Sequence, residues 1–332
     1  MEKVVRLTLC SLFFLALSSA WAETSDTYVG LEFFGSTRID RQQLEKLINL
    51  KSNASAERVT AAQARLEKYF EHAHQKANIQ VASVGANQLA LVVDVPDPLS
   101  SVVTRRLNSP HHVRLASEAP LVLLANIHNR LSKLEQEGRP AQEQWREGFK
   151  FYSDEPVNQM IEEIQKFLPS MRSELLQVVD SDPDPLRRVQ AIELLEWASE
   201  PNDTAANMLA ALDDADPQVR GECAKYLYAR LDQLADDFPF DALIEGLARM
   251  LDRPVHQDRS KALHCVLKLC QLHKDVVPLA KSLTERKVTQ LAKESILPTI
   301  KQPAEALLAI FAASPRFATP QGKEPPPQDS GL

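Results

Sequence analysis

Two near-copies of one stretch organise this sequence: Asp-Pro-Leu-Arg-Arg-Val-Gln-Ala at 184–191 and Asp-Pro-Gln-Val-Arg-Gly-Glu-Cys at 216–223. Each copy follows an apolar helical segment and begins another. Aspartate can cap a helix and proline suits the first helical turn, so each copy predicts a sharp turn between two helices. The two prolines are 32 residues apart, which is within the range of periods found in helical repeats.

The copies also place similar residues at equivalent points of the second helix. Arg188 and Arg220 lie four residues after the aspartate, where a guanidinium group can reach a neighbouring aspartate or an inter-helix carbonyl. One helix pair cannot bury its apolar face alone, so neighbouring pairs must stack. The predicted pairs are 173–179 with 185–198, 203–212 with 217–234, 241–251 with 256–272, and 277–283 with 288–300.

This Asp-Pro-x-x-Arg-x-x-small pattern resembles HEAT-type repeats, closely in two units and weakly in two others. The resemblance implies an all-α solenoid over residues 171–312. Residues 119–170 are predicted to form a helical cap or an atypical first repeat. Residues 313–332 are rich in proline, glutamine and serine, and we expect a disordered tail there.

The first 22 residues are typical of a cleavable secretory signal. Lys3 and Arg6 precede an apolar run at 7–17 that is too short to span a membrane comfortably, and Ala20-Trp21-Ala22 has the small-x-small pattern of a cleavage site. An uncleaved anchor is the alternative. We therefore expect cleavage after Ala22, a periplasmic protein, and no membrane span in the mature chain.

Residues 28–96 follow a different pattern, with a strand, two helices and two further strands. Val29, Leu31 and Phe33 alternate as in a half-buried strand, and Asp40 is the expected N-cap of the first helix. We predict the second helix near 56–77 and the remaining strands at 78–84 and 89–95. The fold class is therefore an α+β module (β-α-α-β-β) followed by helices.

Three parts of this module resemble a POTRA (polypeptide-transport-associated) domain: Val-Gly-Leu-Glu-Phe-Phe-Gly-Ser-Thr-Arg-Ile-Asp at 29–40, Tyr69, and Gln-Leu-Ala-Leu-Val-Val-Asp-Val-Pro-Asp at 88–97. Such modules precede outer-membrane barrels and occur in periplasmic parts of some division proteins. The resemblance implies that strand 78–84 is an exposed edge that accepts an added strand. It thereby indicates Ile79, Val81 and Ser83 as partner-binding residues.

Residues 97–118 are predicted to be a basic linker. Its positive or titratable residues are Arg105, Arg106, His111, His112 and Arg114. A solvated linker is one interpretation, and contact with anionic lipid headgroups or an acidic partner face is the other.

Charge is unevenly distributed along the predicted repeats. Residues 174–237 hold 15 acids and 5 Lys/Arg, whereas residues 259–301 hold 9 Lys/Arg and 3 acids. Solvated outer faces explain this pattern, and so does a polarised stack whose ends attract partners or one another. The net charge of −7 argues against nucleic acid as a general partner.

The sequence contains none of the glycine-rich phosphate or dinucleotide motifs and no Gly-x-Ser-x-Gly elbow. We therefore expect no catalysis, no cofactor and no metal. Cys223, Cys265 and Cys270 are an odd number, so no full disulfide framework is implied, although one pair can form in an oxidising compartment.

These observations predict a non-catalytic adaptor or scaffold of the cell envelope that binds proteins. One binding surface is the predicted edge strand, and the other is the helical stack near Arg188, Arg220 and Arg259. Two alternatives stay open. The first is an accessory protein of an enzyme or lyase system built on HEAT-like repeats, and the second is an envelope spacer that forms homo-oligomers through its charged ends.

Overall fold

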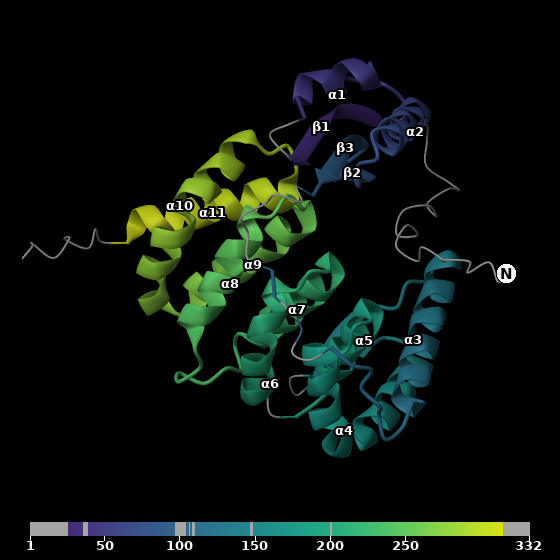
Figure 1. The fold of residues 1–332 in the computed structure, drawn as a ribbon, viewed down its shortest axis with the longest axis vertical. Helices are drawn as coiled ribbons and strands as arrows, with labels where there is room; N and C mark the ends of the chain where they lie inside the picture. The colour runs from purple at the N-terminus through teal and green to yellow at the C-terminus, as the bar shows by residue number, and fades with distance from the viewer. Residues whose placement is uncertain are drawn as a thin grey trace, which may run out of the picture.

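The computed structural model describes residues 26–35, 39–96, 104–105, 107, 110–146, 149–199 and 201–314. A small N-terminal sheet and its two helices lie against a longer helical region (Figure 1). The expected signal segment, part of the expected linker and nearly all of the expected tail lie outside the described residues. No helix in the described part of the chain is both long enough and apolar enough to cross a membrane.

The N-terminal sheet has three strands: β1 (Thr27–Gly35), β2 (Asn78–Gly85) and β3 (Gln88–Val95). Their order is β1-β3-β2, with β1 parallel to β3 and β2 antiparallel to it. Helices α1 (Arg41–Ile48) and α2 (Ala56–His72) connect β1 to β2. The predicted order of strand, two helices and two strands is therefore confirmed.

Local sequence explains where these helices begin and what they bury. The Asp40 carboxylate accepts the backbone N–H of Gln42 at 2.9 Å and so caps α1. Ile39 and Leu44, on either side of that cap, are both buried. One face of the sheet packs on α1 and α2, and the shared core includes Leu31, Leu44, Val59, Leu66, Phe70, Leu91 and Val93.

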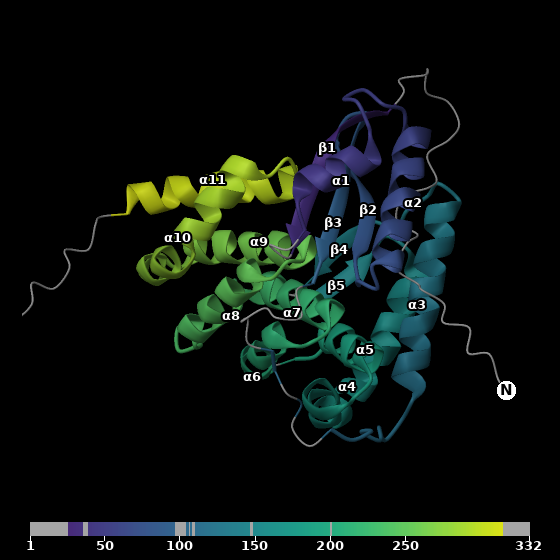
Figure 2. The same ribbon diagram turned by 45° about the horizontal axis from the view of Figure 1, so that its top comes forward.

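The opposite face of the sheet is buried as well. Phe34, Ala90 and Val92 belong to the same apolar core as the helical region. Figure 2 shows β1 and β3 beside α9 and α11, with α1 and α2 on the outer side. The sheet is therefore a layer between α1 and α2 on one side and the helical region on the other, and the N-terminal module is not a separate arm.

The helical region consists of consecutive packed helices. They are α3 (Ala119–Gln136), α4 (Glu155–Ser181), α5 (Pro185–Leu195), α6 (Pro201–Met208), the 3-10 turn η1 (Leu209–Asp213), α7 (Pro217–Arg230), α8 (Phe240–Asp252), α9 (His256–Leu272), the 3-10 turn η2 (Lys274–Val276), α10 (Val277–Glu294) and α11 (Pro298–Ala313). Helices α5, α7, α9 and α11 pack in one row. The other row contains α4, α6 with η1, α8 and α10.

Several predicted boundaries are wrong because tertiary packing overrides proline. Helix α4 runs through Pro169, so the boundary expected between residues 170 and 171 falls inside it. Pro303 likewise lies inside α11, and the last two helices extend well beyond their predicted ends. Proline costs an interior hydrogen bond, but buried neighbours such as Leu168 and Met171 hold the flanking turns of α4 in place.

One element was not expected at all. Strands β4 (Glu143–Arg146) and β5 (Phe149–Tyr152) form an antiparallel hairpin between α3 and α4. Residues 119–170 were predicted to be helical apart from a polar, aromatic-rich stretch. Two strands of four residues are too short to give a period-two signal that stands out in sequence.

Candidate interaction surfaces

The outer edge of β2 is the first candidate site. β2 ends the order of the described sheet, and its sequence, Asn-Ile-Gln-Val-Ala-Ser-Val-Gly, contains neither a charge nor a proline. Charged residues and prolines are the usual protection of a sheet edge against further pairing. β2 lacks both, so it has the composition of a strand that can accept another.

The structure brings the three predicted edge residues together on β2. Ile79 and Val81 pack partly against the core beneath α2, and Ser83 is exposed. The Gln63 side chain of α2 donates a hydrogen bond to the carbonyl oxygen of Ile79 at 3.1 Å. In an antiparallel pair the outward-facing backbone groups recur at every second residue, so the same edge presents Val81 and Ser83.

The opposite edge of the sheet, at β1, is already occupied. The backbone N–H of Tyr28 donates to Ala54 O at 2.9 Å, and Asn53 N–H donates to Tyr28 O at 2.9 Å. Further along, the Arg41 guanidinium donates to Leu31 O at 2.7 Å. The two edges of the sheet therefore differ. In the described part of the chain, β1 is bonded to the backbone of residues 53 and 54, whereas the outer edge of β2 carries the single Gln63 contact at Ile79.

Arg188 and Arg220, which were predicted to lie on a second binding surface, are buried between the packed helices. Only 4% of Arg188 and 3% of Arg220 are exposed. Arg188 forms a two-pronged pair with Asp214, at 3.1 Å through Nε and 2.7 Å through Nη2. Arg220 donates to Asp258 Oδ2 at 2.9 and 2.5 Å. These arginines are internal, so the prediction that they contact a partner is wrong.

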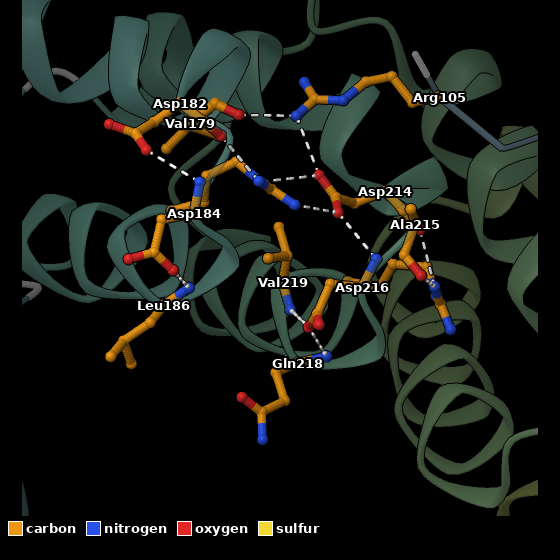
Figure 3. A network of polar contacts seen from close by, with 12 residues as sticks. Arg105, Val179, Asp182, Asp184, Leu186, Asp214, Ala215, Asp216, Gln218 and Val219 are labelled. Atoms are coloured by element: carbon orange, nitrogen blue, oxygen red, sulfur yellow. Dashed lines mark hydrogen bonds and ion pairs between the residues drawn. The ribbon is translucent and has the colours of Figure 1, made fainter. Parts of the chain in front are cut away.

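The burial of Arg188 and Arg220 follows from the repeated turn, whose aspartates are labelled in Figure 3. The Arg188 guanidinium also donates to Asp182 O at 2.8 Å, and that of Arg220 donates to Asp214 O at 2.7 Å. Each arginine thus joins the turn before its own helix to an acid from a later element. The predicted reach to an aspartate and a carbonyl is confirmed, and it consumes the donors that a partner would need.

The turns themselves are built alike. Asp182 and Asp214 each accept the backbone N–H of the residue two positions later, at 3.0 and 2.9 Å. Asp184 and Asp216 then cap α5 and α7 by accepting Leu186 N–H at 3.0 Å and Gln218 N–H at 2.8 Å. This repetition is the physical basis of the two near-copies in the sequence.

The basic segment binds an acidic face of its own chain. Arg105 donates to Val179 O at 2.6 Å and pairs with Asp214 at 3.1 Å and Asp180 at 3.4 Å. Val113 and Leu115 are buried, and Val113 N–H donates to Asp182 Oδ2 at 3.2 Å. In its described part, the interpretation as a solvated linker is therefore wrong.

Burial and pairing have opposite effects on the acids of this network. Burial raises the pKa of Asp182, but hydrogen bonds from Asp184 N–H, His112 and Val113 N–H outweigh it and leave the pKa below its ordinary value. Burial also raises the pKa of Asp258, and there it prevails over the neighbouring Arg220. Asp182, one of the acids counted in residues 174–237, is thus balanced by hydrogen-bond donors inside the molecule.

Arg259 follows Asp258, the partner of Arg220, and contacts the N-terminal sheet. Its guanidinium donates to Arg253 O at 2.7 Å and stacks over the Phe34 ring, 4.6 Å from the ring centre. Burial lowers the pKa of Arg259 to about 10. All three arginines predicted to contact a partner are therefore engaged by contacts within the chain.

Two acids of this interface were not singled out from the sequence, namely Glu32 and Asp94. Only 5% of Glu32 and 1% of Asp94 are exposed. Both extend from the sheet toward helices more than 150 residues away in sequence. The available signal was an acid within an otherwise apolar strand, which is uncommon when both faces are covered.

The described residues offer no other evident chemistry. No three His, Cys, Asp or Glu side chains among them lie close enough to hold a metal ion. Cys223, Cys265 and Cys270 are buried free thiols, and burial raises the pKa of each. Such thiols are poor nucleophiles and poor metal ligands.

Comparison of the chain with protein-family models, curated proteins and solved structures found no match.

Proposed function

We propose that this protein is a non-catalytic scaffold of the cell envelope that binds a protein partner by adding one of its strands to the edge of β2. The open, uncharged edge of β2 is the observation that carries the proposal. An extended partner segment would pair with the backbone of Val81 and Ser83, and at Ile79 it would displace the Gln63 side chain from the carbonyl oxygen. Main-chain hydrogen bonds would supply affinity, and alternate side chains would supply specificity.

The surroundings of β2 support this role. The module has the strand and helix order expected of a POTRA-like domain, and its sheet is held rigidly because both of its faces are packed. A rigid strand loses little entropy when a partner pairs with it. The two rows of packed helices agree with a HEAT-like stack, whose role here is to support the sheet. Export to the periplasm rests on residues 1–22.

The proposal can be tested at Val81. Proline there removes an outward N–H and obstructs the edge, but leaves the alternate hydrogen bonds to β3 in place. Val81→Thr is the matched control, because threonine keeps the backbone donor and the β-branched shape. A photo-crosslinking residue at exposed Ser83, in cells, would report the partner.

We expect Ser83 to crosslink to a defined envelope protein in the wild type and in Val81→Thr, and at least tenfold less in Val81→Pro. A tenfold loss corresponds to about 1.4 kcal/mol of binding free energy. Crosslinking that survives Val81→Pro in full, or that never occurs in the native envelope, would show that β2 is not the binding edge.

Self-association through charged ends is less well supported. Asp182, Asp214 and Glu196, all in the acidic half, are buried in ion pairs with residues of the same chain. Buried charges of this kind do not steer a second copy of the chain.

A further inference from the structure

The N-terminal sheet binds the distant helical region at the starts of two helices. The N-cap residues of α9 and α11 are Val255 and Leu297, and neither of these residues can cap a helix with its side chain. Asp94 of β3 accepts the first N–H of α9, from His256, at 3.2 Å. Glu32 of β1 accepts the N–H of Ile296, just before α11, at 2.9 Å. The sheet thus bonds the first N–H of α9 and the turn that leads from α10 into α11.

The two caps differ in how their charge is balanced. The second oxygen of Asp94 lies 2.6 Å from Nδ1 of His256. Glu32 has no ion-pair partner among the described residues, although only 5% of it is exposed. The Ile296 side chain also packs closely on β1, since a Cβ on Gly30 would lie 3.0 Å from it. Glu32 is therefore a carboxylate that is buried between β1 and the start of α11, with hydrogen-bond donors but no ion-pair partner among the described residues.

The charged groups around Glu32 come from both sides of that interface. Arg41 of α1 and Arg259 of α9 favour its ionised form from a distance, and the Ser295 hydroxyl and Ile296 N–H do so by hydrogen bonding. Arg259 is itself surrounded by further charges, which are Asp94, Asp252, Asp258 and, from α10, Lys287. These groups reduce the cost of burying the carboxylate but do not remove it.

We propose that Glu32 is a proton-dependent latch: the N-terminal sheet holds α9 and α11 more tightly when Glu32 is protonated than when it is ionised. A protonated Glu32 keeps an oxygen that accepts Ile296 N–H, gains a donor, and loses the cost of a buried charge.

The direction of the pH effect follows from linkage. Burial raises the pKa of Glu32 above its ordinary value of 4.5, and the nearby donors and arginines only partly oppose this. The docked sheet therefore binds the proton more tightly than the undocked sheet does. Docking strengthens as pH falls from the raised pKa toward 4.5, and it weakens as pH rises through that window.

Hydrogen exchange of the Ile296 amide measures this docking directly. We expect its protection factor, corrected for intrinsic exchange, to rise as pH is lowered from neutral, by up to about tenfold for each unit by which the pKa is raised. Glu32→Gln imitates the protonated form, so its protection should be independent of pH and equal to that of the acidified wild type. Glu71→Gln, at an exposed position of α2, is the matched control and should follow the wild type.

A titration of the Glu32 carboxyl by carbon NMR in the full chain gives a second, independent readout. A wild-type protection factor that is flat or falls on acidification would overturn the latch. The same conclusion would follow from Glu32→Gln retaining the wild-type pH dependence, or from a measured pKa at or below the ordinary value. The β2 edge lies across the sheet from Glu32, so these outcomes do not depend on strand addition.

Discussion

At the scale of single residues, the chain places charge inside the helical stack. Arg188, Arg220, Asp214 and Asp258 are all nearly inaccessible, and they form ion pairs between neighbouring elements, Arg188 with Asp214 and Arg220 with Asp258. Such pairs gain little over apolar packing, because desolvation offsets their attraction. Their loss on one side only is costly, because it leaves a charge buried without a partner.

Arg220→Leu should therefore lower the free energy of unfolding by about 3–5 kcal/mol, because it leaves the Asp258 carboxylate without its hydrogen-bond donors. Urea denaturation measures the change. Arg139→Leu is the control at an exposed pair with Glu137, and it should stay within about 0.5 kcal/mol of the wild type. Equal effects of the two substitutions would contradict the internal role of Arg220.

At the scale of elements, proline has two roles in this chain. Pro185 and Pro217 occupy the first turns of α5 and α7, where the missing N–H has no helical partner to lose. Pro169 lies in the interior of α4, where the same missing N–H removes a hydrogen bond. Only the first role was predicted, because sequence patterns treat an interior proline as a helix end.

Pro169→Ala should stabilise the protein by about 1–3 kcal/mol, because the restored helical hydrogen bond outweighs the greater freedom of the unfolded chain. Pro169 is exposed, so little packing is lost. Pro185→Ala is the matched control and should be neutral or destabilising by up to about 1 kcal/mol. Thermal unfolding followed by circular dichroism would compare them, and a destabilised Pro169→Ala would mean that the proline shapes α4 favourably.

At the scale of the whole molecule, the N-terminal sheet belongs structurally to the helical region. One face of the sheet belongs to the main core. Asp94 accepts the first N–H of α9, and Glu32 accepts the N–H of Ile296, just before α11. We therefore expect one cooperative unfolding transition and not a separate one for each part. The position of β2 then depends on the packing of the sheet against the helical region.

Asp94→Asn tests this coupling, because asparagine keeps one acceptor but loses the charge that faces the start of α9 and His256. We expect the protection of the first α9 amides against hydrogen exchange to fall by the equivalent of about 1–3 kcal/mol. Asp40→Asn changes only the α1 cap, where asparagine serves as well, so α9 should be unaffected. Unchanged α9 protection in Asp94→Asn would indicate that the module does not hold the helix.

Much of the local structure could be predicted, because its causes are local. The Asp-Pro turns, the start of α1 at Asp40 and the alternation in β1 and β3 each depend on residues a few positions apart. The order of strands and helices in the N-terminal module followed from those signals. Of the candidate site, Ile79, Val81 and Ser83 lie on an edge strand of the described sheet, whereas Arg188 and Arg220 are buried.

What the sequence determined by itself is therefore the set of elements and the chemistry of the turns between them. The tertiary structure alone decided which surfaces meet: that Arg105 pairs with acids of its own chain, that the far face of the sheet is covered, and that Asp94 and Glu32 bind backbone N–H groups at the starts of distant helices. Such contacts join residues far apart in the chain. Their partners follow from how whole elements pack, which no local pattern encodes.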